Sequence, residues 1–160
     1  MAASTRAEET DLFVFVDGPR HEREARLVSE VISLAERAIG FKSVEVQVSP
    51  INVGLSRSIT GGVTKVLRES ETVIVIEDDI VVSRSFLEFM NAHLKLYAND
   101  PTVASIHGYV YPHSQDLPPT FFIAGADCWG WATWRRAWMQ YRADGSALLA
   151  ELEQRSLLNI

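Results

Sequence analysis

The sequence is poor in cysteine and contains no long apolar run. Its single cysteine, Cys128, cannot form a disulfide within the chain, which fits a reducing compartment. The longest apolar runs, at residues 12–16 and 73–76, have the length of strands and fall short of the roughly 20 residues that a membrane-spanning helix needs. Residues 1–11 are polar and carry acids, unlike a signal peptide. We therefore expect a cytoplasmic protein without a transmembrane segment.

Positive charge is also scarce. The chain has 15 lysines and arginines against 21 aspartates and glutamates, a net charge of -6. Nucleic-acid binders usually have a basic surface, so no nucleic-acid partner is expected. An anionic ligand is still compatible with this charge, because a metal ion or a helix N-terminus supplies positive charge locally. With 160 residues, 47% of them hydrophobic, the chain is long enough for one domain with a core.

Strand-like and helix-like patterns alternate along the chain. The continuous apolar runs at 12–16 and 72–76 predict strands that are covered on both faces. Ser85 and Glu88 have the spacing of a capping box at a helix start. Further strands are predicted at 43–49, 103–107 and 121–123, and helices at 20–39, 56–69, 85–97, 132–141 and 146–157. This alternation predicts an α/β domain with a mainly parallel sheet.

Carboxylates follow two of the predicted strands. Asp17 comes directly after the first apolar run, and Glu77, Asp78 and Asp79 come directly after the second. Ligands of open α/β sheets bind beyond the carboxyl ends of the strands. Three adjacent acids repel one another, and a divalent cation that prefers oxygen ligands would offset the repulsion. A solvated acidic turn is the alternative, but the apolar run that feeds into the acids favours a metal site.

Two loops are further candidates for binding a nucleotide. Asp17, Gly18 and the next proline form either an ordinary turn or a site at which the carboxylate accepts a hydrogen bond from a base N–H. In the second loop, which includes Asn52, Gly54 allows a tight turn before a helix whose N-terminus favours phosphate, and Arg57 would pair with a phosphate oxygen. On these residues alone, a plain helix start with a surface arginine is the preferred interpretation.

All four tryptophans lie between residues 129 and 138. Trp131, Trp134 and Trp138 have the spacing of one helix face, and we expect Trp134 and Trp138 in the core. Trp129 and Trp131 flank a glycine, and indole rings stack well on the apolar faces of sugars. Ligand contact and core packing are equally compatible with these two residues.

The ordered motifs together resemble the GT-A-fold glycosyltransferases, especially the family 2-like bacterial enzymes. A more distant likeness is to the animal N-acetylglucosaminyltransferase I type. The motifs span residues 12–141 and are, in order, Asp17-Gly18-Pro19, Asn52-x-Gly54-Leu55, Ile76-Glu77-Asp78-Asp79, Ser85-Phe86-Leu87, and Gly130-Trp131-Ala132-Thr133-Trp134-Arg135-Arg136-Ala137-Trp138. The resemblance implies a three-layer, Rossmann-like domain and inverting transfer of a sugar from a nucleotide diphosphate donor to a glycan or other hydroxyl acceptor, with Mn²⁺ or Mg²⁺.

The resemblance also implies roles for particular residues. Asp17 matches the base-binding aspartate, Asp79 matches the metal ligand of the DXD-type motif, and Asp78 lies near the ribose. No residue matches the family's catalytic base, and Asp127 is the candidate for that role. The expected nucleotide-sugar site comprises Asp17, Gly18, Asn52, Gly54, Arg57, Glu77, Asp78, Trp129 and Trp131.

The sequence departs from the family at its ends. The family's first strand lies inside the sheet, and the eleven residues before Leu12 are too few for that strand and its helix. We expect one domain over residues 1–160, truncated at both ends, whose sheet has a gap or a rearranged pairing that a second copy would complete. The alternative function is a non-catalytic nucleotide- or glycan-binding fragment that needs a partner. A nucleotidyltransferase would show a glycine-rich, basic signature after the first strand, and none is found here.

Overall fold

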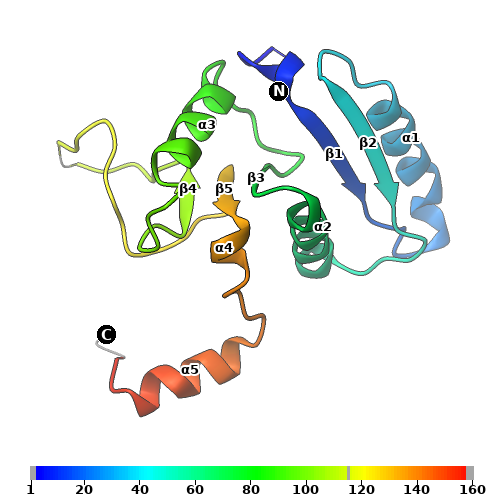
Figure 1. The fold of residues 1–160 in the computed structure, drawn as a ribbon. Coiled ribbons are helices and arrows are strands. Elements are labelled where there is room, and N and C mark those ends of the chain that lie inside the picture. The colour runs from blue at the N-terminus through cyan, green and yellow to red at the C-terminus, as the bar shows by residue number, and fades with distance from the viewer. Residues whose placement is uncertain (1–2, 115, 158–160) are drawn as a thin grey trace.

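The computed structural model describes residues 3–114 and 116–157 as an α/β protein with two small sheets (Figure 1). In the first sheet, β1 (Asp11–Val16) pairs with β2 (Ser43–Val48) in parallel. In the second, β5 (Trp131–Trp134) lies between β3 (Thr72–Val75) and β4 (Ser105–His107) and is antiparallel to both. The helices are η1 (Ala7–Glu9), η2 (Glu22–Glu24), α1 (Ala25–Glu36), α2 (Leu55–Glu69), α3 (Phe86–Leu96), α4 (Arg135–Trp138) and α5 (Gly145–Gln154). None of these helices is long and apolar enough to cross a membrane, as far as the described residues go.

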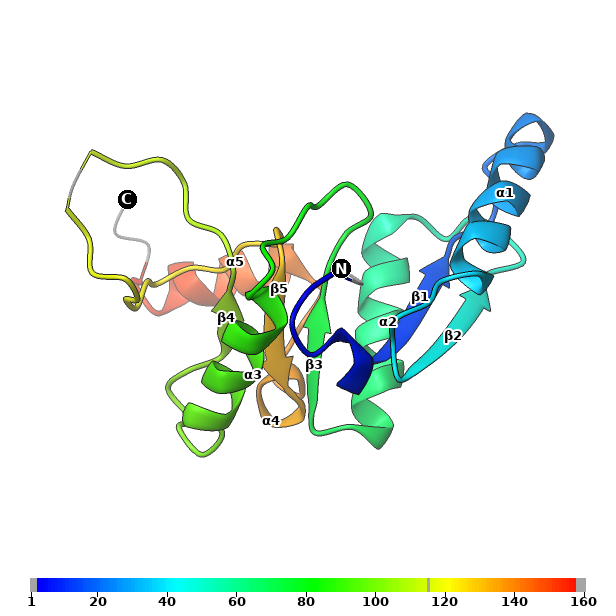
Figure 2. The ribbon, with the colours of Figure 1, turned by 90° about the horizontal axis from the view of Figure 1, so that it is seen from above.

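Helix α2 joins the two sheets. It packs against both β1 and β3, and it lies between them in both views (Figures 1 and 2). Its buried face includes Val63 and Leu67. Gly62 lets the helix approach β1 closely, since a side-chain carbon there would lie 3.0 Å from the ring of Phe15. Within the described residues β1 pairs only with β2 and β3 only with β5, so each of these strands has one open edge.

The best-buried core lies between α3 and the second sheet. Leu87 and Met90 of α3 are almost fully buried, as are Ala132 and Trp134 of β5. These residues form one cluster with Ile106 of β4, so the antiparallel sheet is held against α3 by apolar contact. This packing fixes where β3, β4 and β5 end, and therefore where the loops that follow them lie.

Two arginines next to β5 bind the C-terminal ends of two helices. Arg135 donates from Nε to the Leu67 carbonyl at 2.6 Å and from a terminal nitrogen to the Ser70 carbonyl at 3.0 Å, at the end of α2. Arg136 donates to the Tyr97 and Ala98 carbonyls at the end of α3, at 2.9 Å each. Carbonyls at the end of a helix lack intrahelical donors and carry partial negative charge, so a guanidinium stabilises them.

Replacing Arg135 with alanine is expected to lower the free energy of unfolding by about 1–2 kcal/mol, because the carbonyls at the end of α2 lose charged donors. Urea unfolding followed by circular dichroism measures the change. Arg155→Ala is the matched control, because Arg155 is exposed and its side chain pairs only with Glu151 among the described contacts. An unchanged unfolding midpoint for Arg135→Ala would show that water replaces the guanidinium without loss.

The segment that carries the tryptophans differs from the sequence prediction. We expected a helix over 132–141, but Trp131–Trp134 is a strand and only Arg135–Trp138 is helical. The backbone of this strand pairs on both sides, with β3 and with β4, and that pairing outweighs the helical spacing of the tryptophans. Trp134 is buried as predicted, whereas Trp138 is half-buried.

Other predictions were confirmed in type but not in detail. The strands near residues 12, 43, 72 and 103 and the helices near 25, 56, 86 and 146 are all present, with ends shifted by a few residues. The prediction of a mainly parallel sheet is wrong, because β5 lies between β3 and β4 and is antiparallel to both. Residues 121–123 form no strand. Ser85 precedes α3, but its side chain makes no capping hydrogen bond, so the predicted capping box is not formed.

Candidate functional site

The end of β1 is fastened to the loop after β2 by the carboxylate of Asp17. It accepts hydrogen bonds from the backbone N–H groups of Gly18, Val53 and Gly54, each at 2.9 Å. The side-chain amide of Asn52 donates to the Gly18 carbonyl at 2.8 Å. The hydrogen bond from the Val53 N–H is the main reason that the pKa of Asp17 lies below its usual value. Four of the predicted nucleotide-binding residues thus lie together.

Both glycines of this corner are required by its geometry. A side-chain carbon on Gly18 would lie 2.4 Å from the backbone carbonyl carbon of Ile51, so no side chain fits there. Gly54 has φ of 82°, in the left-handed region that other residues avoid, and α2 starts directly after it. The tie between Asp17 and two backbone N–H groups of the second loop has no side-chain signature and was missed from the sequence. The contact of the Asp17 carboxylate with a nucleotide base stays a prediction.

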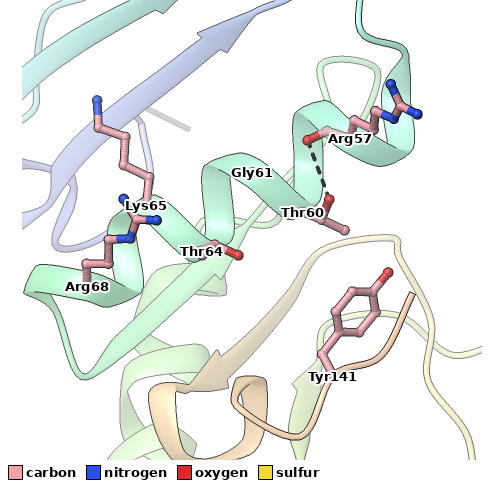
Figure 3. A pocket seen from close by; sticks show the side chains of 7 residues that line it. All are labelled: Arg57, Thr60, Gly61, Thr64, Lys65, Arg68 and Tyr141. Atoms are coloured by element: carbon pink, nitrogen blue, oxygen red, sulfur yellow. Dashed lines mark hydrogen bonds between the residues drawn. The ribbon is translucent and has the colours of Figure 1, made fainter. Parts of the chain in front are cut away.

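Arg57 lies in the first turn of α2 after Gly54, with its side chain exposed. It lines an open groove of about 550 Å³ together with Lys65, Arg68 and Tyr141 (Figure 3). Arg68 follows Arg57 by eleven positions in α2, or about 16 Å along the axis. Figure 3 shows Arg57 at one end of the groove and the other two cations at the opposite end, while the Tyr141 hydroxyl points toward the helix. The cations are therefore spread along the helix and do not converge on one phosphate-sized point.

The acidic triplet forms a turn after β3. Asp78 and Asp79 are exposed, Glu77 is half-buried, and the Ile80 N–H donates to the Glu77 carbonyl at 3.2 Å. Because β3 and β5 are antiparallel, the residues after β3 lie beside those that precede β5. The Glu77 carboxylate and the Cys128 thiol accordingly lie close enough to interact. Cys128 is exposed as a residue, and partial loss of hydration at its thiol is the first cause that raises its pKa, with the charge of Glu77 second.

Asp127, the candidate base, is held by three neighbours. One of its carboxylate oxygens accepts the Trp129 N–H at 2.7 Å, and its carboxylate also accepts the Tyr111 hydroxyl. Its own N–H donates to Nδ1 of His107 at 3.4 Å. The hydrogen bond to Asp127 is the main cause that raises the pKa of Tyr111, so this phenol stays protonated and donates. The side chain of Asp127 is therefore oriented by contacts within the loop between β4 and β5.

His107 supports this arrangement as a neutral ring. Nδ1 accepts from the Asp127 N–H, so Nε2 carries the proton and donates to the Ser105 hydroxyl at 2.7 Å. Burial lowers the pKa of His107. These contacts give His107 a structural role in the loop that carries Asp127.

Lowering the pH is expected to destabilise the protein through His107. Below pH about 6.5, the usual pKa of histidine, His107 binds a proton in the unfolded chain but stays neutral in the folded protein. The free energy of unfolding therefore falls as the pH drops from about 6.5 to the lowered pKa of His107 in the folded protein. Urea unfolding between pH 5 and 7.5, compared with His107→Gln, isolates this contribution from those of the carboxylates. Parallel pH profiles for the two proteins would contradict the expectation.

Three aromatic rings of the same loop as Asp127 contact one another. The ring centroids of Tyr109 and Tyr111 are 5.2 Å apart, and the Trp129 ring lies 4.9 Å from Tyr109 and 5.7 Å from Tyr111. The loop between β4 and β5 (yellow in Figure 1) carries all three. The tyrosines were missed from the sequence, although their alternation directly after a strand was the available signal. Trp131, by contrast, lies in β5 with its ring 6.1 Å from Trp138, on the α4 side.

Within the described residues, no group of three or more histidine, cysteine, aspartate or glutamate side chains is assembled to hold a metal ion. A Mg²⁺ or Mn²⁺ ion that binds together with phosphates needs only one or two carboxylates from the protein. The exposed carboxylates of Asp78 and Asp79 fit that donor set, whereas Glu77 is engaged by Cys128.

Comparison with protein-family models, with curated proteins and with solved structures finds no match for this chain. The case for a function therefore depends on the motifs and on the contacts among their residues.

Proposed function

We propose that the chain is the nucleotide-sugar-binding part of a metal-dependent, inverting glycosyltransferase. The observation that supports it best is the meeting of two acidic segments that lie far apart in the sequence. Val75 of β3 pairs with Trp131 of β5 in the antiparallel direction, so the acidic turn after β3 and the candidate base before β5 lie at the same edge of the second sheet. Trp129 adds an exposed aromatic ring at that edge.

The proposed roles follow from exposure and contacts. Asp79, with Asp78 beside it, would hold Mn²⁺ or Mg²⁺, which supplies positive charge to the diphosphate leaving group. Asp127 would accept the proton of the acceptor hydroxyl as that oxygen bonds to the anomeric carbon and the bond from that carbon to the diphosphate breaks. Tyr111 and the Trp129 N–H keep the Asp127 carboxylate in place during this transfer.

Replacing Asp79 with asparagine is expected to weaken binding of UDP in the presence of Mn²⁺ by more than about tenfold, because the amide is a poor ligand for a hard cation. Isothermal titration of UDP, with GDP and CDP as further probes, measures the affinity with and without Mn²⁺. Asp116→Asn is the matched control, an exposed acid in the loop between β4 and β5. Metal-dependent affinity that is equal in Asp79→Asn and in the unaltered protein would refute the assignment.

A second candidate is a binding module that needs a partner to complete the fold. The open edges of β1 and β3 favour it, as do the exposed side chains of Leu27, Val31 and Leu34 on α1. Light scattering after size-exclusion chromatography gives the mass of the species in solution. A monomer that transfers sugar would exclude this candidate, and a dimer that binds nucleotide without transfer would support it.

A further inference from the structure

The rings of Tyr109, Tyr111 and Trp129 form an aromatic cluster that faces solvent. Their exposed fractions are 39%, 59% and 43%. Three large rings that touch one another outside the core leave apolar surface in water, which is unfavourable unless a ligand covers it. Their position in a loop at the edge of the second sheet makes them a candidate ligand-binding surface.

The cluster is tied to the candidate base by hydrogen bonds. The Tyr111 hydroxyl donates to Asp127, and the Trp129 N–H donates to the same carboxylate. The Gly108 N–H donates to the Gly130 carbonyl at 2.8 Å, which joins the two ends of the loop next to the rings. The Tyr111 side chain and the Trp129 backbone are therefore positioned relative to Asp127, and the ring of Tyr109 packs against both of these residues.

We propose that this aromatic cluster is a platform that binds the acceptor as a neutral carbohydrate. One apolar face of a sugar ring would stack on the exposed aromatic rings, and a hydroxyl of that sugar would reach the Asp127 carboxylate. The identification of the ligand as the acceptor depends on the proposed transferase function. The affinity for neutral sugar depends only on the platform itself.

The charges around the platform disfavour an anionic ligand. Among the described groups, the Asp127 and Glu77 carboxylates act on Tyr111 and Cys128, together with neighbouring weak acids. Carboxylates accept hydrogen bonds from hydroxyls but repel phosphates. A ligand rich in hydroxyls therefore suits this surface better than a phosphate does.

The ring geometry disfavours a quaternary ammonium ligand. Recognition of such a cation uses aromatic faces that surround it, each within about 6 Å of the charge. Here the rings contact one another, with the edge of one tyrosine against the other at an interplanar angle of 81°. Because the rings already fill the space between them, they offer an outer surface for stacking and no enclosed cage.

The test is a titration of the whole chain with neutral tetrasaccharides of glucose, galactose, mannose and N-acetylglucosamine, without nucleotide or Mn²⁺. Binding is followed by saturation-transfer NMR. We expect at least one of them to bind, and Tyr109→Ala and Trp129→Ala to raise its Kd about tenfold or more. Tyr109→Phe and Trp129→Phe should retain most of the affinity, because a flat ring is kept. Tyr141→Ala is the matched control, since Tyr141 is an exposed ring that stacks on Trp138.

The outcomes separate the platform from the proposed function. No binding by any of the four tetrasaccharides, equal affinity in the alanine variants, or tighter binding of tetramethylammonium than of sugar would each overturn the platform. Circular dichroism checks that every variant is folded. Sugar binding that persists while UDP and Mn²⁺ fail to bind would leave the platform standing and remove the transferase. If transfer is observed, Tyr109→Ala should raise the KM for the acceptor and leave the KM for the donor unchanged.

Discussion

Asp127→Asn is expected to lower the rate of sugar transfer by about 10²–10⁴-fold, because an amide cannot take up the proton of the acceptor hydroxyl. The asparagine oxygen can still accept the Trp129 N–H that Asp127 accepts at 2.7 Å, so the loop should keep its conformation. Affinity for the donor should not change, since Asp79 is the proposed metal ligand and the proposed role of Asp127 is toward the acceptor hydroxyl. Initial rates of transfer from a UDP-sugar measure the effect, and calorimetry with UDP and Mn²⁺ measures the donor affinity.

Two variants make this result specific. Asp116→Asn, the same change on an exposed acid in the same loop, should leave the rate unaltered. Tyr111→Phe removes the hydroxyl that Asp127 accepts but keeps the ring, so it should slow transfer less than Asp127→Asn and shift its pH profile. Full activity in Asp127→Asn would exclude Asp127 as the base, and Glu77→Gln would then be the next variant to assay.

The strands near the N-terminus were predictable because their pattern is local. The run at 12–16 and the alternation at 43–49 became β1 and β2, and their ends lie next to each other because the two strands are parallel and in register. Asp17, Gly18, Asn52 and Gly54 were accordingly expected at one edge, where the structure places them. The tie itself was not predictable, because its donors are backbone N–H groups that every residue carries.

The second sheet was not predictable from local pattern. Residues 131–134 form a strand because they pair with β3 and β4, which precede them in the sequence by about 60 and 25 positions. Because β5 is antiparallel to β3 and β4, Cys128 lies near Glu77 and Asp127 lies near His107. Which residues of the candidate site lie together could therefore not be predicted without the strand pairing. The spacing of residues along a segment predicts which face each of them occupies only when the segment is already known to be a helix or a strand.

Trp134→Ala is expected to lower the free energy of unfolding by about 3–5 kcal/mol, a large share of the 5–15 kcal/mol typical of a folded domain. The indole is 3% exposed and packs in the core between β5 and α3. Its Nε1–H also donates to the Leu94 carbonyl at 3.0 Å. The N–H of Ala98, the usual helical donor to that carbonyl, donates to Lys95 instead, so Trp134 supplies the donor that the end of α3 lacks.

Trp134→Phe separates the two contributions. Phenylalanine keeps most of the apolar volume but leaves the Leu94 carbonyl without its indole donor, and we expect a loss of about 1–3 kcal/mol from that and from the smaller ring. Trp129→Ala is the matched control, because an exposed indole should contribute little to folding stability. Urea unfolding of the three variants gives the differences. If Trp134→Ala and Trp129→Ala were equally stable, the contact between β5 and α3 would not be what holds the second sheet, and the site at its edge would need another support.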